Sequence, residues 1–135
     1  VFHQAVANSF KLAFIIVPVL TALTLLLALA LNRATRSAAW LRGLFFSSSV
    51  LSVTIVTLIW RFVLTPDAGL LAELVHAAGM EPLPWLSHPD LTLPAIAIAT
   101  IWWSLGLPMM MFLAGLQQIP ADMYEAAALD RAGRW

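Results

Sequence analysis

The chain has 135 residues, of which 61% are hydrophobic and only 10% are charged, with a formal net charge of zero and no cysteine. Soluble domains carry about 25% charged residues, so this composition is typical of a protein embedded in lipid. The neutral charge balance argues against a nucleic-acid partner, which would need a basic surplus. The absence of cysteine excludes disulfides and thiolate metal sites.

Three apolar runs predict an all-α fold, a polytopic transmembrane helical bundle. The expected spans cover residues 12–31, 44–64 and 93–116 of a single transmembrane domain over 1–135. At a rise of about 1.5 Å per residue, each run reaches roughly the 30 Å thickness of the hydrocarbon core. Helices are expected because every backbone polar group in lipid needs an internal partner.

Prolines and serines interrupt these spans. Pro18 in the first span and Pro108 in the third each free a carbonyl one turn earlier, which favours a local bend. The Gly106-Leu107-Pro108 step is the stronger candidate for a kink, although prolines are also tolerated in membrane helices without any role as a hinge. The second span holds Ser47-Ser48-Ser49 and Ser52, whose hydroxyls we expect to bond backbone carbonyls or to join helices.

The charges of the connecting segments predict the orientation. Residues 32–43 contain three arginines and no acid, whereas the loop 65–92 has no Lys or Arg and contains Asp67, Glu73, Glu81 and Asp90. Positive residues stay on the cytoplasmic side, so the first loop is expected inside, the loop 65–92 outside, and the segment 117–135, with Arg134, in the cytoplasm. Apolar spacing within the outer loop predicts a short surface helix over 69–78 that ends at Gly79.

The segment 117–135 has the features of a short polar helix joined directly to the third span. Pro120 suits the first helical position, and Asp122 favours the positive end of the helix dipole. A small-residue face consists of Ala121, Ala128 and Ala132. A helix that leaves the membrane on such small side chains is suited to docking on a partner.

The same segment closely resembles the EAA loop of bacterial ABC importer permeases, the inner-membrane components of binding-protein-dependent sugar uptake systems. The resemblance rests on Glu125-Ala126-Ala127, followed by Asp130 and Ala132 and preceded by Ala-Gly-Leu-Gln-Gln-Ile-Pro at 114–120. Further matching stretches, such as Asn8-Ser9-Phe10, extend it over nearly the whole chain. The family usually has glycine after the Asp, where this chain has Arg131, and Gly133 is expected to supply the turn instead.

The resemblance implies a multi-pass permease subunit of the bacterial inner membrane, which couples closure of a cytoplasmic ATPase dimer to alternating access. Its implied partners are that ATP-binding subunit dimer, a second permease subunit, an extracytoplasmic solute-binding protein and membrane lipid. No cofactor is implied, and a separate ATPase subunit would hydrolyse ATP, since no Walker-type phosphate loop is present. The ATPase-coupling residues that carry over are Glu125, Ala126, Ala127, Asp130, Ala132 and Gly133.

The third span carries a candidate translocation path formed by Trp102, Trp103, Ser104 and Gly106. Aromatic faces suit sugars, although tryptophan also anchors helices at the membrane interface. His76 and His88 are twelve residues apart without further ligand spacing, so no metal site is expected.

Two alternatives to the importer stay open. A non-transporting membrane anchor or scaffold predicts no docking segment, and an ion-coupled secondary transporter predicts ionisable residues inside the spans, where only Arg61 is found. We also expect the chain to be a fragment, with one span before Val1 and two after Trp135.

Overall fold

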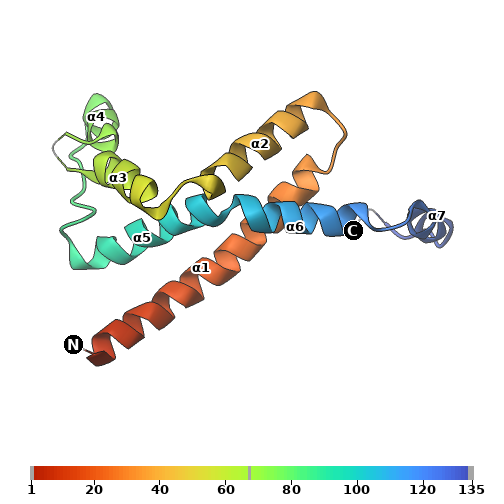
Figure 1. Ribbon diagram of the computed structural model, residues 1–135, viewed down its shortest axis with the longest axis horizontal. Helices are drawn as coiled ribbons and strands as arrows, with labels where there is room; N and C mark the ends of the chain where they lie inside the picture. Colours follow the sequence, from red (N-terminus) through yellow and green to blue (C-terminus); the bar gives the residue numbers. More distant parts are fainter. Residues whose placement is uncertain (1, 67, 134–135) are drawn as a thin grey trace.

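The computed structural model describes residues 2–66 and 68–133, and within them the chain forms helices and no strand, as the sequence predicts. The helices, shown in Figure 1, are α1 (Phe2–Leu31), α2 (Arg36–Val50), α3 (Val53–Leu64), α4 (Leu70–Ala77), α5 (Pro89–Ser104), α6 (Gly106–Gln117) and α7 (Ala121–Leu129). Asp67, Arg134 and Trp135, which the sequence predicts to lie in the outer loop and the cytoplasmic segment, lie outside the described residues.

One helix in the described part of the chain, α1, is long and apolar enough to cross a membrane by itself. Its 30 residues extend about 45 Å. The other two predicted spans are each built from two helices that meet at an angle, 103° between α2 and α3 and 47° between α5 and α6. By length and composition the described residues therefore supply one span, or up to three if each bent pair is one span.

The second predicted span differs from the continuous helix expected over 44–64. Leu51 and Ser52 have extended backbone, and the Ser52 hydroxyl accepts a hydrogen bond from the Ile55 N–H at 3.4 Å, which starts α3. The helix α2 also begins earlier than expected, because Thr35 caps it by accepting from the Ala38 N–H at 3.3 Å. The arginine-rich segment predicted as a loop over 32–43 is therefore mostly helical.

The third predicted span bends at the expected place. The break lies at Leu105, directly before the Gly106-Leu107-Pro108 step. Pro108 has no N–H to donate to the carbonyl of Ser104, which weakens the helix at this point. Pro18, in contrast, lies inside α1, which continues as helix to Leu31.

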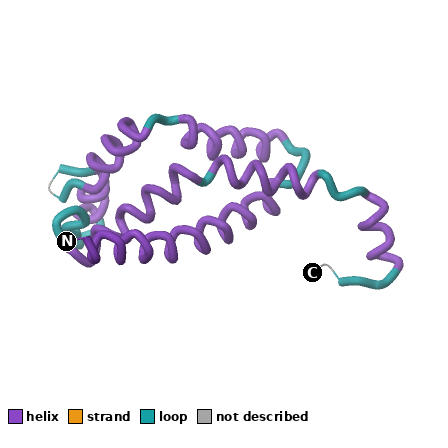
Figure 2. Tube along the Cα trace, turned by 60° about the horizontal axis from the view of Figure 1, so that its bottom comes forward, coloured by secondary structure: helices purple, strands orange, loops and turns teal. Residues whose placement is uncertain are grey.

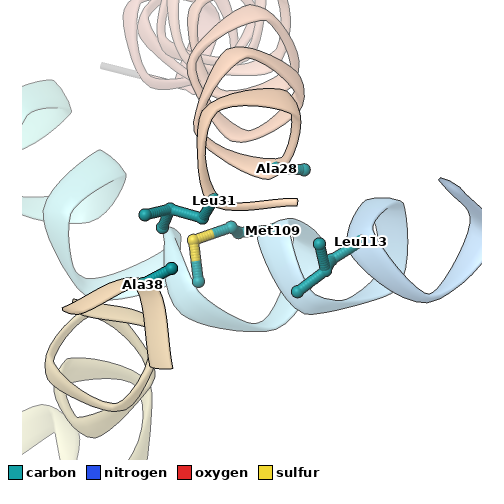
Figure 3. Close-up of a cluster of buried hydrophobic side chains, with 5 residues drawn as sticks. All are labelled: Ala28, Leu31, Ala38, Met109 and Leu113. Carbon is teal, nitrogen blue, oxygen red and sulfur yellow. The ribbon is translucent and has the colours of Figure 1, made fainter. Parts of the chain in front are cut away.

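The bundle is held together around α6. The helix α1 packs along α5 and α6, and α2 packs on α6. A core of five buried side chains joins α1, α2 and α6, and Figure 3 shows them as Ala28, Leu31, Ala38, Met109 and Leu113. Ala28 and Met109 are 0% exposed. Most other large apolar side chains are exposed, as expected for a surface that lipid covers.

The short helix predicted in the outer loop is confirmed as α4, which packs on α3. Gly79 ends it with a left-handed φ of +76°. The N–H of Gly79 donates to the His76 carbonyl at 2.9 Å, and the N–H of Met80 donates to the Val75 carbonyl at 3.0 Å. This pair of bonds is a Schellman motif with glycine at the position that the motif favours.

Candidate functional site

The helix α7 stands away from the bundle at one end of the molecule, opposite the end that holds α4 (Figures 1 and 2). All nine of its residues are exposed, including Leu129 at 85%, and none packs on another helix within residues 2–66 and 68–133. Pro120 takes the N-cap position with φ −60° and ψ 145°, one residue before the helical position predicted for it. Asp122 lies in the first turn as expected. Among the described residues, the surface of α7 is therefore not covered by another helix.

The predicted coupling residues lie on more than one face of α7 and on the turn that follows it. At about 100° per residue, Glu125 and Leu129 share one face with Ala121, Ala126 lies at the edge of that face, and Asp130 lies about 140° around the helix from Glu125. A partner that contacts both Glu125 and Asp130 must therefore enclose α7 in a groove, because a flat surface reaches one face only.

The end of α7 corrects the prediction about its turn. Gly133 does not have a left-handed φ, whereas Arg131 has φ +55°. The N–H of Arg131 donates to the Ala128 carbonyl at 3.2 Å, and the N–H of Ala132 donates to the Ala127 carbonyl at 3.0 Å. These bonds form a second Schellman motif, with arginine where the first has glycine. Arg131 itself makes the turn that we expected from Gly133.

Two helix breaks that are far apart in the sequence meet inside the bundle. The Ser49 hydroxyl donates to the Trp103 carbonyl at 3.1 Å, and the Trp103 indole N–H donates to the Leu51 carbonyl at 3.0 Å. The Ser48 hydroxyl also lies 3.2 Å from the Trp102 carbonyl, in addition to its 2.8 Å bond to the Phe45 carbonyl. We call Ser48, Ser49, Leu51, Trp102 and Trp103 the break junction.

The break junction confirms that the serine hydroxyls of the second span bond carbonyls and join helices. It also supplies hydrogen-bond donors to the backbone carbonyls of Leu51, Trp102 and Trp103, which lie at or beside the breaks. A backbone group left without a partner in hydrocarbon would cost on the order of several kcal/mol. Each broken helix pair thus supplies partners for the backbone of the other.

Glycine at position 106 makes this contact sterically feasible. Gly106 is buried, and a Cβ atom built on it would lie 2.6 Å from both the Phe45 carbonyl oxygen and the Phe46 Cα. The Ser49 Oγ would be 2.7 Å away. The start of α6 therefore lies directly on the backbone of α2, and any larger residue at position 106 would push the two helices apart.

A cavity of about 380 Å³ lies between α3 and α5. Its lining includes Thr57, Trp60 and Arg61 from α3 and Thr100 and Trp103 from α5. The Trp60 indole N–H is buried without a hydrogen-bond partner in the described part of the chain. The cavity therefore combines aromatic walls with a small number of polar groups.

The four residues of the candidate path gather around the α5–α6 kink in different environments. Trp103 lines the cavity, while Trp102 packs edge-to-face on Trp60 with ring centroids 5.9 Å apart. Ser104 is the last residue of α5 and is half-buried, and Gly106 is buried under α2. Sequence reasoning missed the wall that α3 contributes. The signal for this wall was the spacing of Thr57, Trp60 and Arg61, which puts one aromatic and two polar side chains on the same helix face.

The family of the chain follows from comparison with known proteins. A family model described as "Binding-protein-dependent transport system inner membrane component" matches residues 20–135, and the chain belongs to this family. The resemblance found in its sequence is thereby confirmed, and the chain is a permease component of a transport system, integral to a membrane.

Particular relatives agree with this assignment. The chain is 31% identical over 138 residues to the probable ABC transporter permease protein YurN of Bacillus subtilis, and this match covers 99% of this chain and 47% of that protein. It is also 31% identical over 131 residues to the xylose/arabinose import permease protein XacH of Haloferax volcanii, covering 97% of this chain and 41% of that protein. The chain thus spans a little under half the length of these relatives.

The fold has a close counterpart among solved structures. A chain of a bacterial ABC transporter involved in the import of the acidic polysaccharide alginate matches with a TM-score of 0.89 at 24% identity. The match covers 99% of this chain and 48% of that chain. The arrangement of bent helices and separate α7 is therefore a fold of such transporters.

Proposed function

We propose that the chain is part of a permease subunit of an ATP-driven, binding-protein-dependent importer for sugars in the bacterial inner membrane. In this proposal α1 and the two bent helix pairs cross the membrane, and α7 lies in the cytoplasm. A separate ATPase dimer hydrolyses ATP, and a second permease subunit and an extracytoplasmic solute-binding protein complete the complex. Relatives named for xylose and arabinose import and for alginate import support the sugar class.

The observation that carries this proposal is the isolation of α7. A nine-residue helix without a single buried residue gains nothing from packing on the other described helices, and a helix this short is marginal in water by itself. A groove on the ATPase that encloses α7 would bury Leu129 and contact Glu125, Ala126, Ala127, Asp130, Ala132 and Gly133. The residues Gln118 to Pro120 join α7 to α6, so a movement of the docked helix passes directly into the membrane part.

The same proposal gives the cavity between α3 and α5 to the translocation path. Trp103 forms a wall of the cavity and offers an aromatic face on which a sugar ring can stack. Trp102 supports that wall through Trp60. In this proposal Ser104 and Gly106, on either side of the α5–α6 kink, contribute to the path by placing the kink beside the cavity.

Copurification of the full-length parent with its ATPase tests the coupling role. Glu125→Lys reverses the charge on the docking face of α7 and should abolish both the complex and uptake while membrane insertion stays intact. Glu73→Lys is the matched control, because Glu73 is an exposed acid on α4, at the other end of the molecule.

The outcomes separate the alternatives. A complex that survives Glu125→Lys with full uptake would contradict the coupling role of α7. A complex that never forms with the unmodified parent would favour the anchor or scaffold.

A further inference from the structure

Trp103 is held at both its side chain and its backbone by the region of the α2–α3 break. Its indole N–H donates to the Leu51 carbonyl within the break, and its carbonyl accepts from the Ser49 hydroxyl just before it. The two bonds, 3.0 and 3.1 Å long, lie on opposite sides of Val50 in the sequence. Trp103 is thus bound to the end of α2 while its side chain lines the cavity.

The break junction lies between the docking helix and the cavity. The helix α6 leads from α7 to the Leu105 kink, and Met109 and Leu113 anchor it against α1 and α2. At the kink, Gly106 touches the backbone of α2, and the junction connects α5 to the break from which α3 starts. Side chains of α3 form the opposite wall of the cavity.

We propose that Ser49 and Trp103 are positioning residues that couple the two helix breaks, so that a movement of α6 changes the cavity in step with α7. This inference rests on the proposed function as an ATP-driven permease. Without the Ser49 bond, bending of the α5–α6 kink moves the α2–α3 break less, and the cavity responds more weakly to the ATPase.

A thiol placed in the cavity measures this response directly. The chain contains no cysteine, so Thr57→Cys in a full-length parent freed of any other cysteine gives one reporter on the α3 wall. The experiment measures the rate of N-ethylmaleimide labelling in the assembled complex, without nucleotide and after trapping with ATP and vanadate. ATP hydrolysis is measured on the same preparation.

The Ser49→Ala variant is expected to reduce the nucleotide-dependent change in labelling rate by roughly fivefold, since one hydrogen bond shifts such an equilibrium by about that factor. ATP hydrolysis should continue. Ser47→Ala is the matched control: its exposed hydroxyl donates to the Leu44 carbonyl within α2, at 2.7 Å, and its loss should leave the change intact. Ser49→Thr keeps the hydroxyl and should restore most of the response.

Each other outcome decides against a particular claim. If Ser49→Ala keeps the full labelling change, or if Thr57→Cys never responds to nucleotide in a complex that hydrolyses ATP, the coupling of the breaks is refuted and the permease function stands. If the parent assembles with no ATPase, the proposed function fails and this inference fails with it. Should Ser49→Ala not assemble, Trp103→Phe removes the indole donor while keeping an aromatic ring in the cavity wall, and an unchanged labelling response in that variant refutes the inference.

Discussion

Replacement of Arg131 by glycine is the most direct test of how α7 ends. Arg131 has φ +55°, a left-handed conformation that costs an L residue about 1–2 kcal/mol. Glycine avoids this cost but loses roughly 0.5–1 kcal/mol more backbone entropy on folding. The difference predicts that Arg131→Gly stabilises the last turn of α7 by about 0.5–1 kcal/mol. Both Schellman bonds should persist, because Gly79 makes the same pair at the end of α4.

Hydrogen exchange at the end of α7 provides the assay. The amides of Arg131 and Ala132 donate the two bonds of the motif, so they exchange when this turn opens. A stabilisation of that size slows their exchange by about two- to fivefold. The measurement is made by mass spectrometry on the full-length parent in nanodiscs, without the ATPase, so that docking does not contribute.

Two glycine variants complete the test. Gly79→Ala forces an L residue into φ +76°, and it should speed exchange at the end of α4 by a similar factor. Gly133→Ala should change nothing, because Gly133 is not left-handed and a Cβ there meets no atom within 4 Å. The reasoning is refuted if Arg131→Gly leaves exchange unchanged while Gly133→Ala speeds it, since the turn would then lie at Gly133.

Three further substitutions test the packing by unfolding or proteolysis of the full-length parent. Gly106→Ala should destabilise the bundle by about 1–3 kcal/mol, because α6 must move away from α2, and an unchanged midpoint in SDS unfolding would contradict the close approach. Met109→Ala should lower the free energy of unfolding by about 2–5 kcal/mol in the same assay, because Met109 is fully buried. Met111→Ala should lower it little, because the Met111 side chain is 68% exposed, and equal losses in the two variants would argue against the core around Met109. Gly69→Ala should loosen α4 from α3, because its Cβ would lie 2.8 Å from the carbonyls of Phe62 and Val63; faster proteolysis of the segment 68–80 is the expected sign, and an unchanged rate would count against it.

The sequence predicts those features of the fold that depend on local chemistry. Apolar runs fix where most of the helices lie, and Gly79 and the Gly106-Leu107-Pro108 step mark a helix end and a kink through their own backbone preferences. The helix α7 is likewise predictable, because a helix without contacts to the other described helices keeps its local pattern. The ATPase-coupling role itself stays a prediction.

The break at Leu51 and Ser52 is not predictable in the same way. No proline or glycine lies there, and an apolar run from 44 to 64 favours a continuous helix. The break depends on Trp103, 52 residues further along the chain, whose indole satisfies the Leu51 carbonyl. Ser52 was a local signal, since serine is a preferred N-cap, but it has this effect only where the backbone before it has other partners.

Arg131 shows the opposite limit of sequence reasoning. Its neighbours favour a turn, and the nearest glycine is the natural candidate, yet the position of the turn is set by where the helix ends. The carbonyls of Ala127 and Ala128 need donors from the residues that follow Asp130, so the left-handed residue must be the next one, whatever its side chain. Glycine two positions later cannot satisfy these carbonyls with the same pair of bonds. The hydrogen bonds of the helix end therefore outweigh the roughly 1 kcal/mol preference for glycine, and they form the same turn in a chain that has arginine at position 131.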